Sequence, residues 1–232
     1  MSRMLAKLFA SFLALPEWFV TDLPGPAGYA LRTWYWRLRM KHVGRGVTFG
    51  RGVRISGPKW MSIGDNSWID DDVILSAGPA NEQGRVLIRK PNEFFGHDEG
   101  ILFIGMNCHI APQVTIQAHG GVSIGNDSGV ASGCRIYSLS HHYRNAGDPK
   151  DSRLYSFTPR AAPESQSLIL SPVVMEDNSA LATNSVVLPG ATIGKGTWVG
   201  CLSLVIGSLP PGVQASGQPA KPKKAIGAAG GT

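Results

Sequence analysis

The sequence predicts a mainly β protein: a parallel β-helix of about six coils with two long loop insertions and a short N-terminal helical segment. Two observations predict it. Large apolar residues recur every six positions, and the 29 glycines, which follow no Gly-X-Y repeat, often come directly after them. A six-residue period suits a three-sided coil in which each side is a short strand with one inward side chain. Stacked coils would then bury a continuous aliphatic column.

The period begins at residue 43 and predicts a coil domain over 43–207, between an N-terminal segment 1–42 and a tail 208–232. Two-residue insertions fall at 55–63 and 116–124, and long insertions at 76–103 and 137–174. Because insertions in a solenoid leave at the corners, often on the binding side, we expect the long loops to shape a site. The inward positions are Val43, Phe49, Ile55, Ile63, Ile69, Leu75, Ile104, Ile110, Ile116, Ile124, Val130, Ile136, Met175, Leu181, Val187, Ile193, Val199 and Val205.

The net charge of +6 is concentrated at the N-terminal end. Residues 1–54 hold nine basic and two acidic residues, whereas the remainder is nearly neutral. The coil therefore offers little support for nucleic-acid binding. Three cysteines without metal-ligand spacing fit a reducing compartment and predict no metal site.

Residues 1–42 predict an amphipathic helical segment. Leu5, Leu8, Phe9, Phe12 and Leu13 fall at helical spacing before Pro16, and Leu31, Trp34, Tyr35 and Leu38 repeat that spacing among basic residues. Three interpretations stay open: a helical cap on the coil or a neighbouring subunit, a segment lying in a membrane interface, and a cleaved signal peptide. The apolar run is too short to span a bilayer.

The runs IGDNSWI at 63–69 and VLPGATIG at 187–194, with the closing GQPAK at 217–221, resemble the hexapeptide-repeat acyltransferases, in their sugar and polysaccharide O-acetyltransferase branch. The resemblance implies a left-handed coil, acetyl-CoA as co-substrate, a homotrimer with active sites between subunits, and a cytoplasmic enzyme. One coil departs from the pattern, because Glu176, Ala180 and Ala182 stand where the family has glycine, tryptophan and glycine.

The second long insertion opens on two adjacent histidines, His141 and His142. Acyl transfer from a thioester to a hydroxyl needs a base near neutral pKa, which histidine supplies. The resemblance places the base at this point of the chain, so we expect His141 to be the general base, with His142 as the alternative. Further acceptor-binding candidates are Tyr143, Arg144, His97, His109, Gln113 and His119.

For the donor, the resemblance implies that the pantetheine arm of acetyl-CoA lies along the C-terminal coils. Small residues there would permit close approach, and basic residues of the tail would meet the phosphates. The candidates are Ala182, Gly200, Ser203, Lys221 and Lys224.

Three other functions compete with sugar O-acetylation as an interpretation of the sequence. An N-acetyltransferase acting on a nucleotide amino-sugar would use the same base. A γ-type carbonic anhydrase shares the coil but needs three zinc-binding histidines, and the adjacent pair His141 and His142 does not fit its spacing. A non-catalytic structural or binding β-helix would need neither the histidines nor the two long loops.

Overall fold

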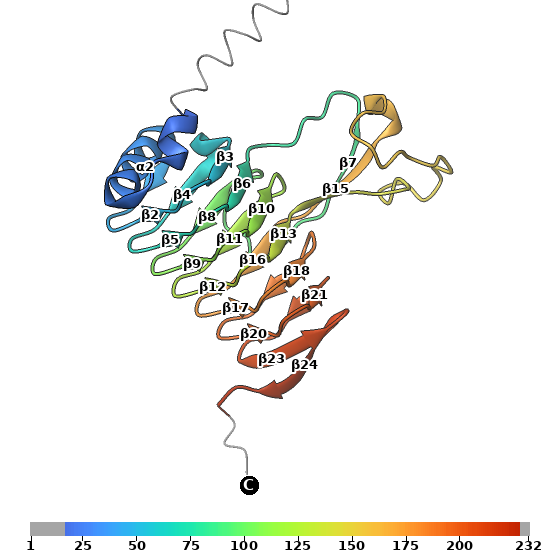
Figure 1. Ribbon diagram of the computed structural model, residues 1–232. Helices are drawn as coiled ribbons and strands as arrows, with labels where there is room; N and C mark the ends of the chain where they lie inside the picture. The colour runs from blue at the N-terminus through green and yellow to red at the C-terminus, as the bar shows by residue number, and fades with distance from the viewer. Residues whose placement is uncertain (1–16, 228–232) are drawn as a thin grey trace, which may run out of the picture.

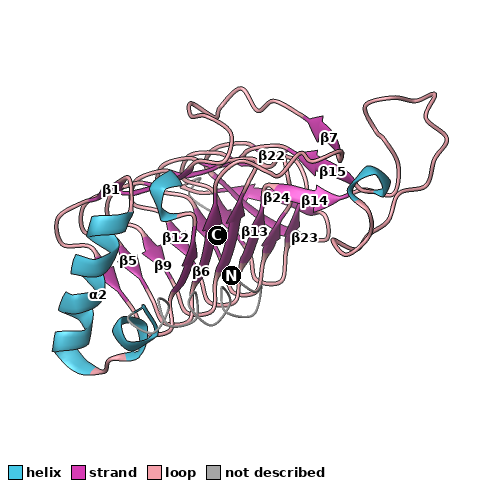
Figure 2. Cartoon of the chain, turned by 90° about the horizontal axis from the view of Figure 1, so that it is seen from above, coloured by secondary structure: helices cyan, strands magenta, loops and turns pink. Residues whose placement is uncertain are grey.

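The computed structural model describes residues 17–227 and confirms the β-helix: three parallel sheets form the sides of a left-handed coil, as Figure 1 shows along its length and Figure 2 from above. Sheet 1 contains β1 (His42–Val43), β4 (Met61–Ile63), β8 (Leu102–Ile104), β11 (Val122–Ile124), β16 (Val173–Met175), β19 (Thr192–Ile193) and β22 (Ser208–Leu209). Sheet 2 contains β2 (Thr48–Phe49), β5 (Trp68–Ile69), β9 (His109–Ile110), β12 (Gly129–Val130), β17 (Ala180–Leu181), β20 (Trp198–Val199), β23 (Val213–Gly217) and β24 (Ala220–Ala225). Sheet 3 contains β3 (Arg54–Ser56), β6 (Ile74–Ala77), β10 (Thr115–Ala118), β13 (Arg135–Tyr137), β18 (Val186–Val187) and β21 (Leu204–Val205).

The predicted inward residues form the core. Within sheet 1, Ile63, Ile104, Ile124 and Met175 pair directly from one coil to the next. All the predicted inward residues are buried except Ile55, which is partly buried on the first coil. Each fully buried aliphatic side chain contributes roughly 1.5–3 kcal/mol, so the column is the main source of stability.

The coil corners combine two kinds of residue. The glycine after an inward residue, such as Gly64, has an ordinary φ, but a Cβ there would lie 2.7 Å from the backbone of the next coil. The left-handed φ falls two positions later, for example at Asn66 with φ 58° and at Asn107 with φ 55°. The first position therefore needs glycine for close approach, and the second tolerates asparagine.

The coil continues beyond residue 207, where the sequence-based boundary was wrong. Strands β22 and β23 extend sheets 1 and 2, and they bury Leu209 and Ala215. The six-residue period misses them because only four positions separate Val205 from Leu209. Strand β24 then turns back antiparallel to β23, so much of the predicted tail is a hairpin.

Helix α2 (Gly25–Arg39) lies across the N-terminal end of the coil and follows a helical turn over residues 17–22. Its polar groups bond to the open edge of the first coil. Arg32 donates from Nε to the Phe49 carbonyl oxygen at 2.8 Å, and Arg37 donates to the Gly44 carbonyl oxygen at 2.9 Å. The Gly52 N–H donates to the Thr21 carbonyl oxygen at 3.1 Å. Residues 17–39 thus form a cap on their own coil.

The apolar face predicted for this helix is not the face that it buries. Gly28, Arg32 and Trp36 are buried against the coil, whereas Trp34 and Leu38 are 58% and 67% exposed. No helix within residues 17–227 is long and apolar enough to cross a membrane. The earlier apolar run lies outside the described residues: Leu5, Leu8, Phe9, Phe12 and Leu13.

Candidate active site

All four interruptions of the six-residue period leave the coil at one corner. Each follows a strand of sheet 3 and returns to a strand of sheet 1: they lie between β3 and β4, β6 and β8, β10 and β11, and β13 and β16. The first of them holds a short 3-10 helix, η1 (Pro58–Trp60). The two long insertions therefore emerge on the same side of the molecule, two coils apart.

The long insertions meet in a small sheet that projects from this corner, which we call the arm (Figures 1 and 2). Strand β7 (Val86–Arg89) comes from the first insertion, and β14 (Leu139–His141) and β15 (Ser167–Leu170) come from the second, which also holds the 3-10 helix η2 (Pro163–Ser165). Strand β15 pairs antiparallel with β14 and parallel with β7. Apolar residues of the arm, including Ile88, Leu168 and Leu170, are buried. The arm is therefore a packed element that fixes the position of the residues on it.

His141 is the last residue of β14, opposite Leu168 of β15. Its Nε2 atom is buried and has no hydrogen-bond partner among the described residues. Leaving a buried polar atom unpaired costs about 1–3 kcal/mol, and such atoms call for an explanation of their own. The Nε2 atom of His141 therefore keeps its hydrogen-bonding capacity unused within residues 17–227.

His142 is held by its own loop. Its backbone N–H donates to the Ser167 carbonyl oxygen at 2.9 Å, and its Nδ1 lies 2.7 Å from the Arg144 carbonyl oxygen. The imidazole ring stacks on Tyr143 at 4.7 Å, and the Arg144 guanidinium lies 5.5 Å from the centre of the same tyrosine ring. Half-buried His142 and exposed Tyr143 and Arg144 thus form one cluster next to His141.

The loop beyond this cluster is organised by Asp151. Its carboxylate accepts hydrogen bonds from the Arg153 guanidinium at 2.7 Å and the Tyr155 hydroxyl at 2.6 Å. The paired Arg153 guanidinium holds the pKa of Asp151 well below its usual range. A cavity of about 460 Å³ lies between this loop and the cluster, lined by His142, Arg144 and Asp151 among others.

Of two further predicted histidines, His119 lies at the same corner and His97 lies over the outer face of sheet 1. His119, on the intervening coil, has both ring nitrogens engaged: Nδ1 lies 2.8 Å from the Gly78 carbonyl oxygen and Nε2 lies 3.1 Å from the Ser76 hydroxyl. These bonds hold the start of the first insertion in place, so the contacts of His119 are structural. His97 stacks on Phe103 and lines a cavity of about 600 Å³ beside Lys41 and Asp98.

The structure does not bring His109 and Gln113 to this corner. His109 faces outward from sheet 2, where it stacks on Trp68 at 4.9 Å and its Nε2 lies 3.3 Å from Asp70. Gln113 is exposed at the next corner, between sheets 2 and 3, with φ 62°. His109 and Gln113 are on the coil next to that of His141, but they lie on other sides of it.

The donor candidates gather at the corner between sheets 2 and 3, on the last coils. The N–H of Ala182 donates to the Val199 carbonyl oxygen and that of Gly200 to the Ala215 carbonyl oxygen, which stacks these turns one above the other. Lys221 and Lys224 follow on β24 beside β23. Ser203 is the exception: it is buried, and its hydroxyl accepts from the Gly217 N–H at 3.2 Å. We call Ala182, Gly200, Lys221 and Lys224 the donor strip.

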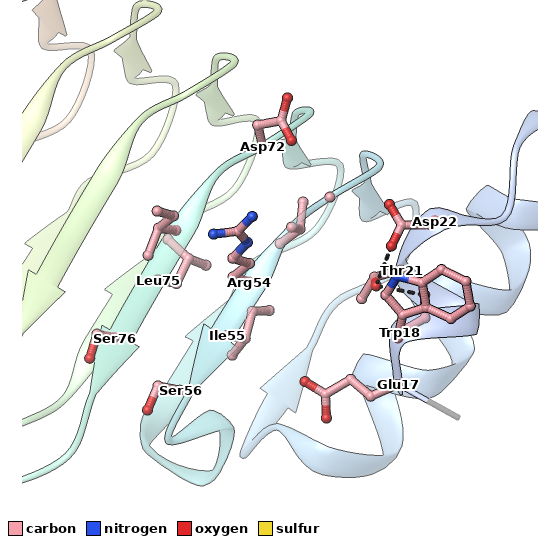
Figure 3. Close-up of a pocket in the computed structure, with 13 residues that line it drawn as sticks. Glu17, Trp18, Thr21, Asp22, Arg54, Ile55, Ser56, Asp72, Leu75 and Ser76 are labelled. Carbon is pink, nitrogen blue, oxygen red and sulfur yellow. Dashed lines mark hydrogen bonds between the residues drawn. The ribbon is translucent and has the colours of Figure 1, made fainter. Parts of the chain in front are cut away.

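A separate hollow of about 650 Å³ lies on sheet 3 beneath the helical turn at 17–22 (Figure 3). Arg54 and Asp72 face Asp22 and Trp18 across it. It belongs to the first two coils, whereas His141 leaves the fourth, so it is not part of the arm site. Within residues 17–227, no group of three or more histidine, cysteine, aspartate or glutamate residues could hold a metal ion.

No family model matches the chain. It is 34% identical over 122 residues to WbbJ of Escherichia coli, whose name assigns it to lipopolysaccharide biosynthesis as an O-acetyl transferase; the match covers 53% of this chain and only 59% of WbbJ. It is 26% identical over 192 residues to WcaF of Escherichia coli, named for colanic acid biosynthesis, with 83% of this chain and 73% of WcaF covered. It is also 26% identical to galactoside O-acetyltransferase of Escherichia coli, over 70% of this chain and 62% of that enzyme.

Two solved structures share the fold. AntD, an N-acyltransferase from Bacillus cereus, was solved as a variant with dTDP-4-amino-4,6-dideoxyglucose and coenzyme A; it aligns with a TM-score of 0.65 and 22% identity over 84% of this chain and 89% of AntD. A hexapeptide-repeat acetyltransferase from Vibrio cholerae, complexed with acetyl coenzyme A, aligns with a TM-score of 0.51 and 20% identity over 90% of this chain and 81% of that protein. In its coil and in these similarities, the chain resembles the hexapeptide-repeat acetyltransferases.

Proposed function

We propose that this protein transfers an acetyl group from acetyl-CoA to a hydroxyl group of a sugar, with His141 as the general base. The observation that carries the proposal is the buried Nε2 of His141, unpaired among the described residues on a rigid strand at the corner where both long insertions emerge. The relatives named above add support for a sugar or polysaccharide acceptor and an acyl-CoA donor.

In this mechanism Nε2 of His141 accepts the proton of the sugar hydroxyl as the oxygen attacks the thioester carbonyl carbon. A tetrahedral oxyanion forms, and a hydrogen-bond donor of the site stabilises it. Collapse of this intermediate breaks the carbon–sulfur bond, and the protonated His141 returns its proton to the departing thiolate. The transfer is direct, so no serine or cysteine nucleophile is needed.

The cluster of His142, Tyr143 and Arg144 would hold the acceptor. An aromatic ring and a guanidinium suit a polyhydroxylated sugar that carries a phosphate. The donor strip lies at the corner between sheets 2 and 3, whereas His141 lies at the corner between sheets 3 and 1. A site that uses both therefore needs two copies of the chain, and we propose a homotrimer in which His141 of one copy meets the donor strip of another, at work in the cytoplasm where acetyl-CoA is available.

A second candidate function is N-acetylation of a nucleotide-linked amino-sugar. It is favoured by the likeness to AntD, which was solved with dTDP-4-amino-4,6-dideoxyglucose. The same base would serve, because an ammonium acceptor must also lose a proton before attack. The two candidates differ in the bond formed, an ester or an amide.

The full chain, incubated with acetyl-CoA and a panel of acceptors, is expected to release coenzyme A only when a suitable sugar is present. The panel should contain galactosides, nucleotide-linked sugars, a nucleotide amino-sugar and polysaccharide fragments, with products identified by mass spectrometry. An acetylated product that mild alkali cleaves is the expected ester. An alkali-stable product would establish the amide instead, and no acceptor-dependent release would favour a non-catalytic β-helix.

The donor strip can be tested by cysteine labelling. Cys108 and Cys134 are buried, and burial raises the pKa of both thiols, whereas Cys201 is exposed directly beside Gly200. We expect one rapidly alkylated thiol in the native protein, three after denaturation, and slower labelling of Cys201 when acetyl-CoA is added. If acetyl-CoA leaves the Cys201 labelling rate unchanged while the enzyme turns over, the donor lies elsewhere.

A further inference from the structure

Helix α2 carries an apolar stripe on the side facing away from its own coil. Ala27, Ala30, Leu31, Trp34 and Leu38 recur at three- and four-residue spacings; Leu31 is half-buried and the other four are exposed. The opposite side, with Arg32 and Trp36, is buried on the coil. A surface helix of a water-soluble protein normally turns its apolar stripe inward, so α2 is inverted.

The inversion is built into the contacts of the helix. Arg32 faces the coil because its guanidinium bonds to the carbonyl oxygens of Phe49 and Leu23 at 2.8 and 2.7 Å. A rotation that buried Trp34 and Leu38 would remove both bonds and the Arg37 bond to Gly44. The stripe is therefore held outward by polar contacts, and water is a poor environment for it.

Basic residues lie within and just after the helix that carries the stripe. Arg37 and Lys41 have no acidic partner among residues 17–227, and the side chain of Arg45 is 94% exposed, although it lies 3.5 Å from Asp65. The acidic residues of the segment face elsewhere: Glu17 pairs with Arg39 at 2.7 Å, and Asp22 borders the hollow on sheet 3 (Figure 3). The sixteen residues before the helical turn add two basic residues and no acidic one.

We propose that the outward face of α2 docks on the surface of a bilayer that contains anionic lipids. An exposed tryptophan and leucine suit the boundary between headgroups and acyl chains, and flanking basic side chains add attraction to anionic headgroups. This goes beyond acetyl transfer and does not depend on it. Because α2 lies across one end of the coil, the coil would stand with that end on the membrane (Figure 1).

The test is sedimentation of the full chain with vesicles of phosphatidylcholine alone and of phosphatidylcholine mixed with phosphatidylglycerol. We expect stronger binding to the mixed vesicles, and a fall of at least about tenfold in the partition coefficient for Trp34→Glu/Leu38→Glu. The matched control is Leu154→Glu/Phe157→Glu. Both residues belong to the second insertion and are 77% and 68% exposed, and this variant should bind the vesicles as strongly as the wild type does. Deleting residues 1–42 is unsuitable because it also uncovers the first coil.

A charge variant separates the two contributions. Lys41→Gln/Arg45→Gln should weaken binding to the mixed vesicles by about fivefold per charge and leave binding to phosphatidylcholine unchanged. Should Trp34→Glu/Leu38→Glu not fold, judged by circular dichroism, the conservative variant Trp34→Phe replaces it: brominated lipids should quench the wild-type tryptophan fluorescence more than that of this variant.

Three results would overturn the proposal. The first is wild-type protein that sediments with neither kind of vesicle, and the second is a glutamate variant that binds as strongly as the wild type. The third is wild-type protein that binds no vesicles but self-associates in solution, while the glutamate variant does not self-associate. This result would assign the stripe to contact with a second copy of the chain. None of these outcomes bears on acetyl transfer, which is measured separately with a water-soluble acceptor.

Discussion

Replacing His141 by alanine is expected to lower kcat for acetyl transfer by roughly 10²–10⁴-fold, the contribution of a positioned general base. The acceptor hydroxyl would keep its proton during attack, because the ring of His142 is tied to the Arg144 carbonyl oxygen and does not replace the lost base. The measurement is initial-rate kinetics with the acceptor found in the panel, at saturating acetyl-CoA. KM for acetyl-CoA should change little.

The matched control is His142→Ala, which removes the neighbouring imidazole from the same loop. It should raise KM for the acceptor and lower kcat far less than the first substitution does. His141→Ala should leave the midpoint of thermal unfolding near that of the wild type. Nε2 of His141 has no hydrogen-bond partner among the described residues, so the substitution removes no hydrogen bond of that atom within them. A larger loss of kcat from His142→Ala would assign the base to His142.

Replacing Gly64 by alanine is expected to lower the free energy of unfolding by about 3 kcal/mol, near the upper end for a group forced into a packed interior. The added Cβ would lie 2.7 Å from the Gly105 carbonyl carbon and from the Met106 amide nitrogen. Both atoms are backbone of the next coil, so the coils must separate to admit the methyl group. The measurement is urea unfolding followed by circular dichroism.

Gly129→Ala is the control for that substitution. Gly129 also lies on the coil, in β12, but a Cβ there would meet no atom within 4 Å and its φ is not left-handed. We expect its unfolding midpoint to stay within about 0.5 kcal/mol of the wild type. Equal unfolding curves for the Gly64 and Gly129 variants would show that the coils do not rely on close backbone approach.

The architecture could be predicted because one local rule repeats along it. Each inward residue from Val43 to Val205 except Ile55 occupies the same kind of buried site, so a six-residue period is visible without any long-range contact. The rule failed where a turn is shorter, between Val205 and Leu209. The left-handed corner residue is Gly at some corners, such as Gly46, and Asn or Asp at others, such as Asn66 and Asp127. The second signal was present in the run IGDNSWI.

The site could be predicted only in part. The position of His141 at the start of an insertion is a local feature of the sequence, but its burial arises from the arm, which joins β7 to β15 about 80 residues later. No periodicity predicts that pairing. The bonds of His119 to Gly78 and Ser76 are likewise long-range, so its structural contact could not be told from substrate contact. Ser203 did carry a local signal, since it follows Val199 by four positions, like the buried corner residues Ser67 and Ser185.

The bonds from the N-terminal helices to the first coil have a consequence for assembly. A stacked coil is open at both ends, and each end presents unpaired backbone groups that can template another copy. At the first end, Arg32, Arg37 and the Thr21 carbonyl occupy groups that a preceding coil would otherwise pair with. At the last end, β24 folds back on β23 and presents Pro222 and three lysines. These contacts disfavour head-to-tail stacking of copies at the first coil and along sheet 2 at the last one.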